Sequence, residues 1–261
     1  MNELLFDVKK VETQSLLGSD FKIASGISHA IVGKGDKILH FCSEGYGLVP
    51  NRQIYEEFVG YFEEHNIAFD ATGINFRDSR FKMNFALTDY PIDMGGGDIL
   101  FPAIGILNSY NGYQKYQFEV GIWRKVCSNG LSILVDGETI KMLHTPQVTE
   151  GMAVEKSIDL LTNFLELYDD AIEPFEELQD FPVHDVPARI QEVVEATKFP
   201  VGLLQLSIDR ALQELKDYKL APTDWLVYNC LNYQLNHHVD NLVGRKASAI
   251  DKEVLQYLLT Y

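Results

Sequence analysis

Hydrophobic and polar residues alternate with a period of two through much of the first half of the chain, which is the pattern of half-buried β-strands. The alternation that runs from Phe21 to Ile31 resumes at Ile38 after the turn residues 33–36, so we predict a β-hairpin there. Further strand patterns cover residues 67–69, 74–76, 81–85, 99–107 and 116–122.

Turn residues separate several of these strands. The strand patterns on either side of residues 71–73 have opposite parity, which predicts a β-bulge. Asn-Gly at 111–112 and Asp-Gly at 136–137 are typical of type I′ turns, so we predict two more hairpins. The glycine-rich segment 94–98 lacks the spacing of a phosphate-binding loop and is predicted to be a flexible hairpin loop.

Helical periodicity occurs once in the strand-rich half and dominates from Thr149 onward. Asn51 is the candidate N-cap of a helix of about four turns. Apolar residues spaced alternately four and three apart from Val154 to Phe175 predict a long helix, bent or ended near Pro174. Another helix is expected over residues 204–215, and a further one from residues 222–223.

The order of the elements predicts an α+β fold, because strands come first and helices follow. We expect the last helix to begin at Ser248, which forms a candidate capping box with Asp251. Residues 1–148 are predicted to form an antiparallel β-rich part with one inserted helix. Residues 149–261 are predicted to form a mostly helical part that packs on the sheet, giving one compact domain.

Composition narrows the class of protein. The chain has 261 residues, of which 46% are hydrophobic and 23% charged, as in a soluble globular protein. The longest apolar run, 99–107, contains Pro102 and is too short for a membrane span, and the N-terminus lacks a secretion signal, so we expect no membrane and a cytoplasmic location. The cysteines at 42, 127 and 230 have no CxxC spacing, which argues against disulfides and a zinc site.

The formal net charge of −16 disfavours nonspecific binding of polyanions by the whole surface. The charge is uneven: residues 1–150 carry 13 basic and 19 acidic side chains, and residues 151–261 carry 9 and 19. Basic patches are therefore possible in the first part. The acidic run 166–180 is either a solvated helix face or a surface that binds a basic protein partner.

Arg124 falls on the apolar face of the strand that carries Phe118 and Val120. It is either a structural fork that binds carboxylates or loop carbonyls, or a buried anchor for an anionic ligand. In the structural interpretation it braces a turn at residues 128–130.

The chemistry-bearing side chains form no convincing catalytic set. Cys127 lies near Arg124 and Lys125 and could be a nucleophile, but no histidine is close in sequence, so a packed thiol is favoured. His237, His238 and Asp240 could bind a metal, but helix-end polar residues are the simpler interpretation. We therefore favour a non-enzymatic role with no metal and no cofactor.

One stretch combines basic and aromatic residues as single-strand binding requires, with cations for phosphates and rings for bases. The alternative is that most of the rings belong to the core. The candidate nucleic-acid-binding residues are Arg77, Arg80, Lys82, Lys115, Trp123, Arg124 and Lys125.

Three motifs resemble a known family. Residues 124–131, RKVCSNGL, are similar to the R-x-x-C-[ST]-N-G signature of the phage/plasmid-related domain of unknown function numbered 932. Residues 223–237 resemble its T-x-W-x-x-Y-N-A-x-T-x-Y-x-x-H helix, and residues 46–51 resemble its strand-to-helix junction. The family-motif residues are Cys127, Asn129, Gly130, Trp225, Tyr228, Asn229 and His237.

The resemblance implies a mobile-element context but no enzymatic activity. The family's usual Asp before the final His is Asn236 here, which removes an Asp-His pair. The helical stripe that begins with Trp225, Tyr228 and Asn229 either packs on the sheet or forms half of a site with Arg124 and Asn129.

Two functions remain from the sequence. The first is a phage- or plasmid-type protein of DNA metabolism that binds or anneals single-stranded DNA, with a homo-oligomer as its candidate assembly. The alternative is an acidic protein-binding module, such as an inhibitor or host-defence modulator, that engages a basic protein partner.

Overall fold

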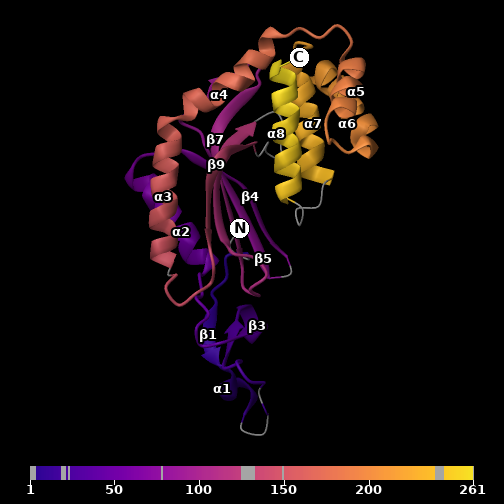
Figure 1. The fold of residues 1–261 in the computed structure, drawn as a ribbon. Helices are drawn as coiled ribbons and strands as arrows, with labels where there is room; N and C mark the ends of the chain where they lie inside the picture. The colour runs from indigo at the N-terminus through magenta and orange to yellow at the C-terminus, as the bar shows by residue number, and fades with distance from the viewer. Residues whose placement is uncertain are drawn as a thin grey trace. The chain divides into compact units, whose positions relative to one another are not determined.

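The computed structural model describes residues 4–18, 22, 24–77, 79–124, 133–148, 150–238 and 244–260. Antiparallel strands occupy the first half of the chain, and helices follow from Glu150 onward (Figure 1). The α+β fold predicted from the order of the elements is therefore confirmed.

A small antiparallel sheet is formed near the N-terminus by β1 (Lys9–Glu12), β2 (His29–Val32) and β3 (Ile38–Cys42), in the order β1-β2-β3. The short helix α1 (Thr13–Leu17) follows β1, and the 3₁₀ turn η1 (Lys34–Asp36) joins β2 to β3. The predicted hairpin is confirmed for β2 and β3. Phe21 and Ile23, which began the alternating pattern, lie outside the described residues.

A six-stranded sheet contains the remaining strands: β4 (Phe69–Arg77), β5 (Arg80–Leu87), β6 (Ile92–Asp93), β7 (Ile99–Ser109), β8 (Tyr116–Arg124) and β9 (Ile133–Met142). Its order is β4-β5-β7-β8-β9, and β6 pairs with β7. The register between β4 and β5 shifts between Ala71 and Gly73, which confirms the predicted bulge.

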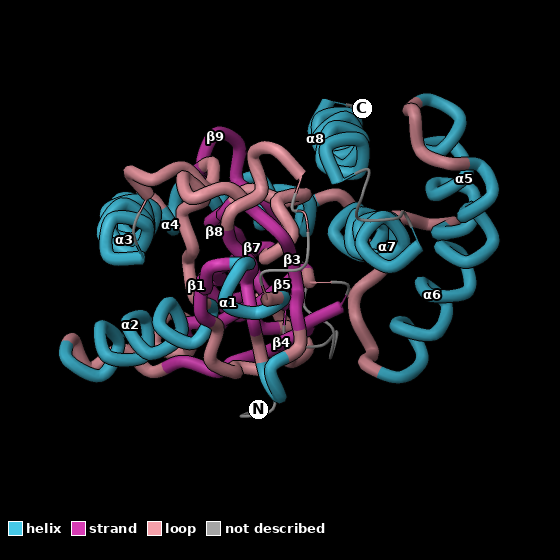
Figure 2. The backbone as a smooth tube through the Cα atoms, turned by 90° about the horizontal axis from the view of Figure 1, so that it is seen from below, coloured by secondary structure: helices cyan, strands magenta, loops and turns pink. Residues whose placement is uncertain are grey.

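One face of this sheet packs against helix α2 (Asn51–Glu64), which lies beside the strands in Figure 2. Alternate residues of β5 and β8 point to this face, and Phe58 of α2 stacks on Phe118 with ring centroids 5.5 Å apart. Phe62 contacts Phe85 edge to face at 5.6 Å. The main core of the strands therefore lies between α2 and this face.

Helices dominate the rest: α3 (Glu150–Glu166), α4 (Tyr168–Glu177), α5 (Val186–Ala196), α6 (Leu204–Asp217), α7 (Asp224–His238) and α8 (Gly244–Thr260), with 3₁₀ turns η2 (Leu178–Asp180) and η3 (Val201–Leu203). The long helix predicted from Val154 exists, but its break lies at Leu167, whose φ of −107° and ψ of 8° leave the helical region. Pro174 sits inside α4, which ends at Glu177, close to the predicted position.

The chain divides into two compact units. The first, which we call the sheet unit, comprises residues 1–90, 102–121 and 135–165. The second, the helical unit, comprises residues 91–101, 122–134 and 166–261. Each is described by its own contacts below.

Two local predictions fail because long-range hydrogen bonds outweigh local ones. Asn51 does not cap α2: it is the first helical residue, and its Oδ1 accepts a 2.7 Å hydrogen bond from Asn108 Nδ2. Its backbone N–H donates to the Tyr110 hydroxyl at 2.8 Å. Ser248 does not begin the last helix, which starts at Gly244, and Asp251 binds side chains of α7 instead of capping.

Both predicted type I′ turns are wrong. Residues 136–137 lie inside the continuous strand β9, where sheet pairing overrides the local preference of Asp-Gly. Gly112 has a φ of +72°, but Asn111 is not among the residues of positive φ, as type I′ requires. The connection from β7 to β8 is longer and is held by Ser109 Oγ, which bonds the backbone of Gln114.

Candidate functional site

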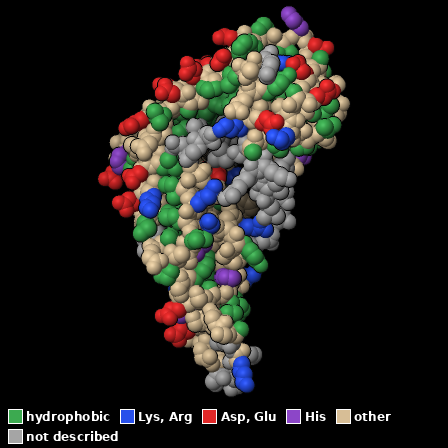
Figure 3. Space-filling model, in the orientation of Figure 1, with side chains coloured by type: hydrophobic (Ala, Val, Ile, Leu, Met, Phe, Trp, Pro, Cys, Tyr) green, Lys and Arg blue, Asp and Glu red, His purple; other side chains and the backbone are tan. Residues whose placement is uncertain are grey.

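The face of the six-stranded sheet opposite α2 is polar within the sheet unit. On β5, Arg80, Lys82 and Asn84 alternate with buried core residues and are partly exposed. Figure 3 shows several Lys and Arg side chains in the middle of the view, at the level of the strands. We call the following set the polar sheet face: Arg80, Lys82, Asn84, Gly105, Gln117, Glu119 and Lys141.

A row of alternating glycines and polar residues crosses this face. Gly73 of β4 pairs with Asn84 of β5, which pairs with Gly105 of β7. A Cβ atom on Gly105 would lie 3.4 Å from Asn84 Oδ1 and 3.7 Å from Glu119 Oε2. Gly105 is partly exposed, and the side chains of Asn84 and Glu119 flank the position where its own side chain would begin.

Glu119 of β8 is an acid of the polar sheet face, and the exposed Asp70 of β4 lies on the same side, because it pairs with Ala86. Burial raises the pKa of the Glu119 carboxyl, and the hydrogen bond from Gln117 and the charges of Lys82 and Lys141 act in the opposite direction. The net rise means that desolvation changes the pKa of Glu119 more than the neighbouring cations and the Gln117 hydrogen bond do.

Among the described residues, the cations of the polar sheet face have no carboxylate at ion-pair distance. Arg80, Lys82 and Lys141 form no ion pair with any residue that the structure describes, and they are partly or fully exposed. Several other cations of the chain are paired: Lys9, Arg52, Arg124, Arg189, Lys198 and Arg210. The polar sheet face thus retains positive charge for an anionic ligand.

Most aromatic rings of these strands point away from the polar sheet face. They alternate with its residues and belong to the core, as one of the two interpretations of the sequence had it. The buried rings that alternate with it are Phe81, Phe85, Tyr110, Tyr116 and Phe118, whereas buried Phe101 has the strand parity of Gly105. Lys115 is exposed at the start of β8, and Tyr113 beside it is 88% exposed.

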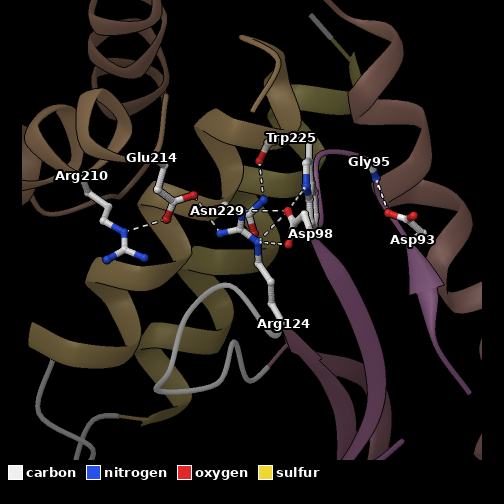
Figure 4. Close-up of polar contacts among 8 residues, drawn as sticks. All are labelled: Asp93, Gly95, Asp98, Arg124, Arg210, Glu214, Trp225 and Asn229. Carbon is white, nitrogen blue, oxygen red and sulfur yellow. Dashed lines mark hydrogen bonds and ion pairs between the residues drawn. The ribbon is translucent and has the colours of Figure 1, made fainter. Parts of the chain in front are cut away.

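Arg124 lies in a second polar cluster, entirely within the helical unit (Figure 4). Its Nε is 2.8 Å from both carboxylate oxygens of Asp98, and its Nη1 donates to Glu214 Oε2 at 2.9 Å. All three side chains are fully buried. Of the two interpretations of Arg124, the contacts favour the structural fork.

The loop before β7 aims Asp98 at this cluster. Gly95, Gly96 and Gly97 have φ angles of +86°, +61° and +82°, a run that residues other than glycine adopt only with strain. The Met94 N–H donates to the Asp98 carbonyl at 2.7 Å, and Asp93 Oδ1 accepts from the Gly95 N–H. The segment predicted to be a flexible hairpin loop is a hairpin loop between β6 and β7 with a defined hydrogen-bond pattern.

Helices α6 and α7 complete the cluster. Glu214 also accepts from Arg210 Nε at 2.7 Å, and the Arg210 guanidinium lies 4.3 Å from the centre of the Tyr233 ring. Trp225 Nε1 donates to Asp98 Oδ2 at 2.9 Å. Two carboxylates and two guanidinium groups balance in charge, so the cluster holds strands and helices of the helical unit together.

The family-motif residues of α7 are mostly buried. Asn229 donates its side-chain N–H to the Trp225 carbonyl at 2.8 Å, and Tyr228 donates its hydroxyl to Asp251 Oδ2 of α8 at 3.0 Å. His237 is exposed, with its ring centroid 4.1 Å from that of Tyr233. Trp123 is partly buried and stacks on Phe101 at 5.7 Å.

Five predicted site residues cannot be placed. Lys125, Cys127, Asn129 and Gly130 lie outside the described residues, as does the side chain of Arg77. The suggested half-site formed by the α7 stripe with Asn129 is therefore untested. Among the described residues, no group of three or more His, Cys, Asp or Glu side chains is arranged to hold a metal ion.

The structure adds residues to both clusters that the sequence did not single out as a site. Asp98 and Glu214 are 26 and 90 residues from Arg124, and no pattern in the chain links them. Glu119 and Lys141 would have been easier to predict from the sequence. Strand alternation alone puts Glu119 on the face opposite Phe118.

Comparison with known proteins places the chain in a family. The family model described as Domain of unknown function (DUF932) matches residues 38–248, most of the chain, and the chain belongs to this family. All three sequence motifs fall inside that range, so the resemblance is confirmed. No curated protein and no solved structure gives a significant match. No described helix combines the length and apolarity needed to cross a bilayer.

Proposed function

We propose that the sheet unit binds single-stranded nucleic acid across the polar sheet face. One observation carries the proposal: Arg80, Lys82 and Lys141 share one face of a sheet and are not paired with carboxylates among the described residues. Cations of this kind release counterions from a phosphate backbone, which is the main source of nonspecific affinity.

The other residues of the face suit a single strand better than a duplex. Asn84 and Gln117 offer amide donors and acceptors. The glycines at 73 and 105 project no side chain from the sheet. Unpaired bases can be laid flat and hydrogen-bonded on such a surface, as single-stranded RNA is on other sheet proteins.

Electrostatics should carry most of the affinity, since the rings of these strands are buried. Stacking on aromatic side chains adds roughly 1–3 kcal/mol per base where rings are available. Here most of them lie on the opposite face of the sheet, so binding should be weaker and more sensitive to salt than in proteins with aromatic platforms. The net charge of −16 opposes binding, but distant acids are screened beyond about 8–10 Å at 0.1–0.15 M salt.

The test is fluorescence anisotropy with a short labelled DNA strand at low ionic strength. Lys82→Ala should weaken binding several-fold, because it removes a phosphate contact. Lys216→Ala is the matched control: Lys216 is exposed on α6, in the helical unit, and the variant loses the same charge. Absence of binding, or equal losses in the two variants, would overturn the proposal.

Binding of a basic protein partner is the second candidate function, favoured by the exposed face of α4 and η2. The sequence from Glu166 to Ala188 contains no Lys or Arg, and Leu167 and Phe181 beside it are 53% and 39% exposed. The exposed acids of this face are Asp169, Asp170, Glu173, Glu176, Glu177 and Asp180. Calorimetric titration with a lysine-rich peptide, before and after replacing Glu173, Glu176 and Glu177 by Gln, tests this function.

A further inference from the structure

Two side-chain oxygens flank the partly exposed Gly105 on the polar sheet face. The position that a Gly105 Cβ would occupy lies 3.4 Å from Asn84 Oδ1 and 3.7 Å from Glu119 Oε2. These side chains come from β5 and β8, the two neighbours of β7 in the sheet. A planar group laid over Gly105 would therefore meet both oxygens at its edge.

Neither oxygen is used by the described part of the protein. Gln117 donates to Glu119 Oε1, and no described residue donates a hydrogen bond to Glu119 Oε2 or Asn84 Oδ1. Glu119 is partly buried, and a partly desolvated carboxylate forms strong hydrogen bonds with a donor. A ligand at this position should therefore carry hydrogen-bond donors.

The chemistry of the nucleobases makes this requirement selective. Cytosine, adenine and guanine each carry an exocyclic amino group, and carboxylates accept hydrogen bonds from the cytosine N4 amino group in known complexes. Thymine has no amino group, and its two carbonyl oxygens flank its single N–H. Over Gly105 a carbonyl would face the Glu119 carboxylate, acceptor against acceptor.

We infer that the polar sheet face recognises the exocyclic amino group of a base laid over Gly105, with Glu119 as the specificity-determining residue and Asn84 beside it. The inference rests on the proposed function, because Lys82 and Lys141 beside Glu119 would hold the phosphates of the same strand. Amino-bearing bases are favoured there over thymine.

The experiment compares labelled oligo-dC and oligo-dT of equal length by fluorescence anisotropy. The wild-type protein should bind oligo-dC about fivefold more tightly or better, the ratio expected for one well-placed base contact. Glu119→Gln, which keeps the shape but adds a donor and removes the charge, should bring the ratio below about twofold. Lys82→Ala should weaken both strands and leave the ratio unchanged.

Equal affinities for the two strands, or an unchanged ratio in Glu119→Gln, would overturn the inference while leaving strand binding intact. A second measurement separates it from the proposed function: the backbone amide of Gly105 is followed by NMR during titration with CMP or TMP. If no oligonucleotide binds but CMP alone shifts this amide, the proposed function fails and base reading stands for free nucleotides. If neither nucleotide shifts it and no strand binds, both are wrong.

Discussion

Arg124 at the end of β8 and Trp225 in the first turn of α7 bind the same carboxylate, that of Asp98. The Arg124 guanidinium also lies 5.8 Å from the centre of the Trp225 ring. Each residue belongs to one of the motifs that mark the family, and the structure explains why they occur together. Arg124 and Trp225 bind the buried Asp98 carboxylate from two directions.

Replacing Arg124 by Met should strongly destabilise the protein. The change leaves Asp98 and Glu214 buried with less positive charge, and breaking a buried pair costs roughly 3–5 kcal/mol. The free energy of unfolding is measured by urea denaturation. Arg52→Met is the control, because Arg52 is paired with the largely exposed Asp7 and its loss should cost about 1 kcal/mol. Similar costs at the two positions would contradict the structural role of Arg124.

The two tryptophans offer a matched pair of substitutions. Trp225→Phe removes a hydrogen bond to a buried carboxylate and should cost roughly 1.5–3 kcal/mol through that bond. Trp123 Nε1 has no hydrogen-bond partner among the described residues, so Trp123→Phe loses only ring contacts. Denaturation curves should therefore show the larger loss for Trp225→Phe, and the reverse order would contradict the assignment of the Trp225 N–H to Asp98.

Gly97→Ala should destabilise the loop that positions Asp98. Its φ of +82° costs a side-chain-bearing residue about 1–2 kcal/mol, although no atom would lie within 4 Å of the new Cβ. Gly151→Ala in α3 is also uncrowded but has no positive φ, and it should stabilise the protein by up to about 1 kcal/mol. Thermal melts of the two variants should shift in opposite directions.

Asp251 makes stability depend on pH. Burial raises its pKa to about 6, although Tyr228 and Asn232 donate hydrogen bonds to it. A carboxyl whose folded pKa is raised contributes stability below its unfolded pKa, near 4, and that contribution is lost as pH rises through 6. The loss amounts to roughly 3 kcal/mol over this window.

Asp251→Asn removes this titration. Urea denaturation at several pH values between 4 and 7.5 should show that the variant gains stability relative to the wild type as pH rises. Parallel curves for the two proteins would show that the pKa of Asp251 is not raised.

Strand and helix periodicity predicted much of the fold because it reflects which face of each element is buried. The alternation of Phe81, Met83 and Phe85 marked β5, and the spacing from Leu204 marked α6. Helix α5 was not predicted, although Asp185 caps it by accepting from the Ala188 N–H and a proline lies in its first turn. That local signal was available and would have identified it.

Predictions from short turn motifs failed where distant partners decided the outcome. Asp136-Gly137 lies within β9 because a neighbouring strand supplies hydrogen bonds. Asn51 binds Asn108, which is 57 residues further along the chain. The residues of the two candidate sites also differ in whether a local sequence pattern predicts them. Alternation places Lys82 on one face of β5, whereas only the folded chain brings Asp98 and Glu214 to Arg124.

The salt dependence of single-stranded DNA binding tests the role of the polar sheet face most directly. The logarithm of the association constant should fall linearly with the logarithm of salt concentration, with a slope of about −0.7 for each phosphate contacted. A variant that carries both Lys82→Ala and Lys141→Ala should have a slope shallower by about 1.4, one increment for each lysine. An unchanged slope, or no binding by the wild-type protein at low salt, would contradict a nucleic-acid-binding role for this face.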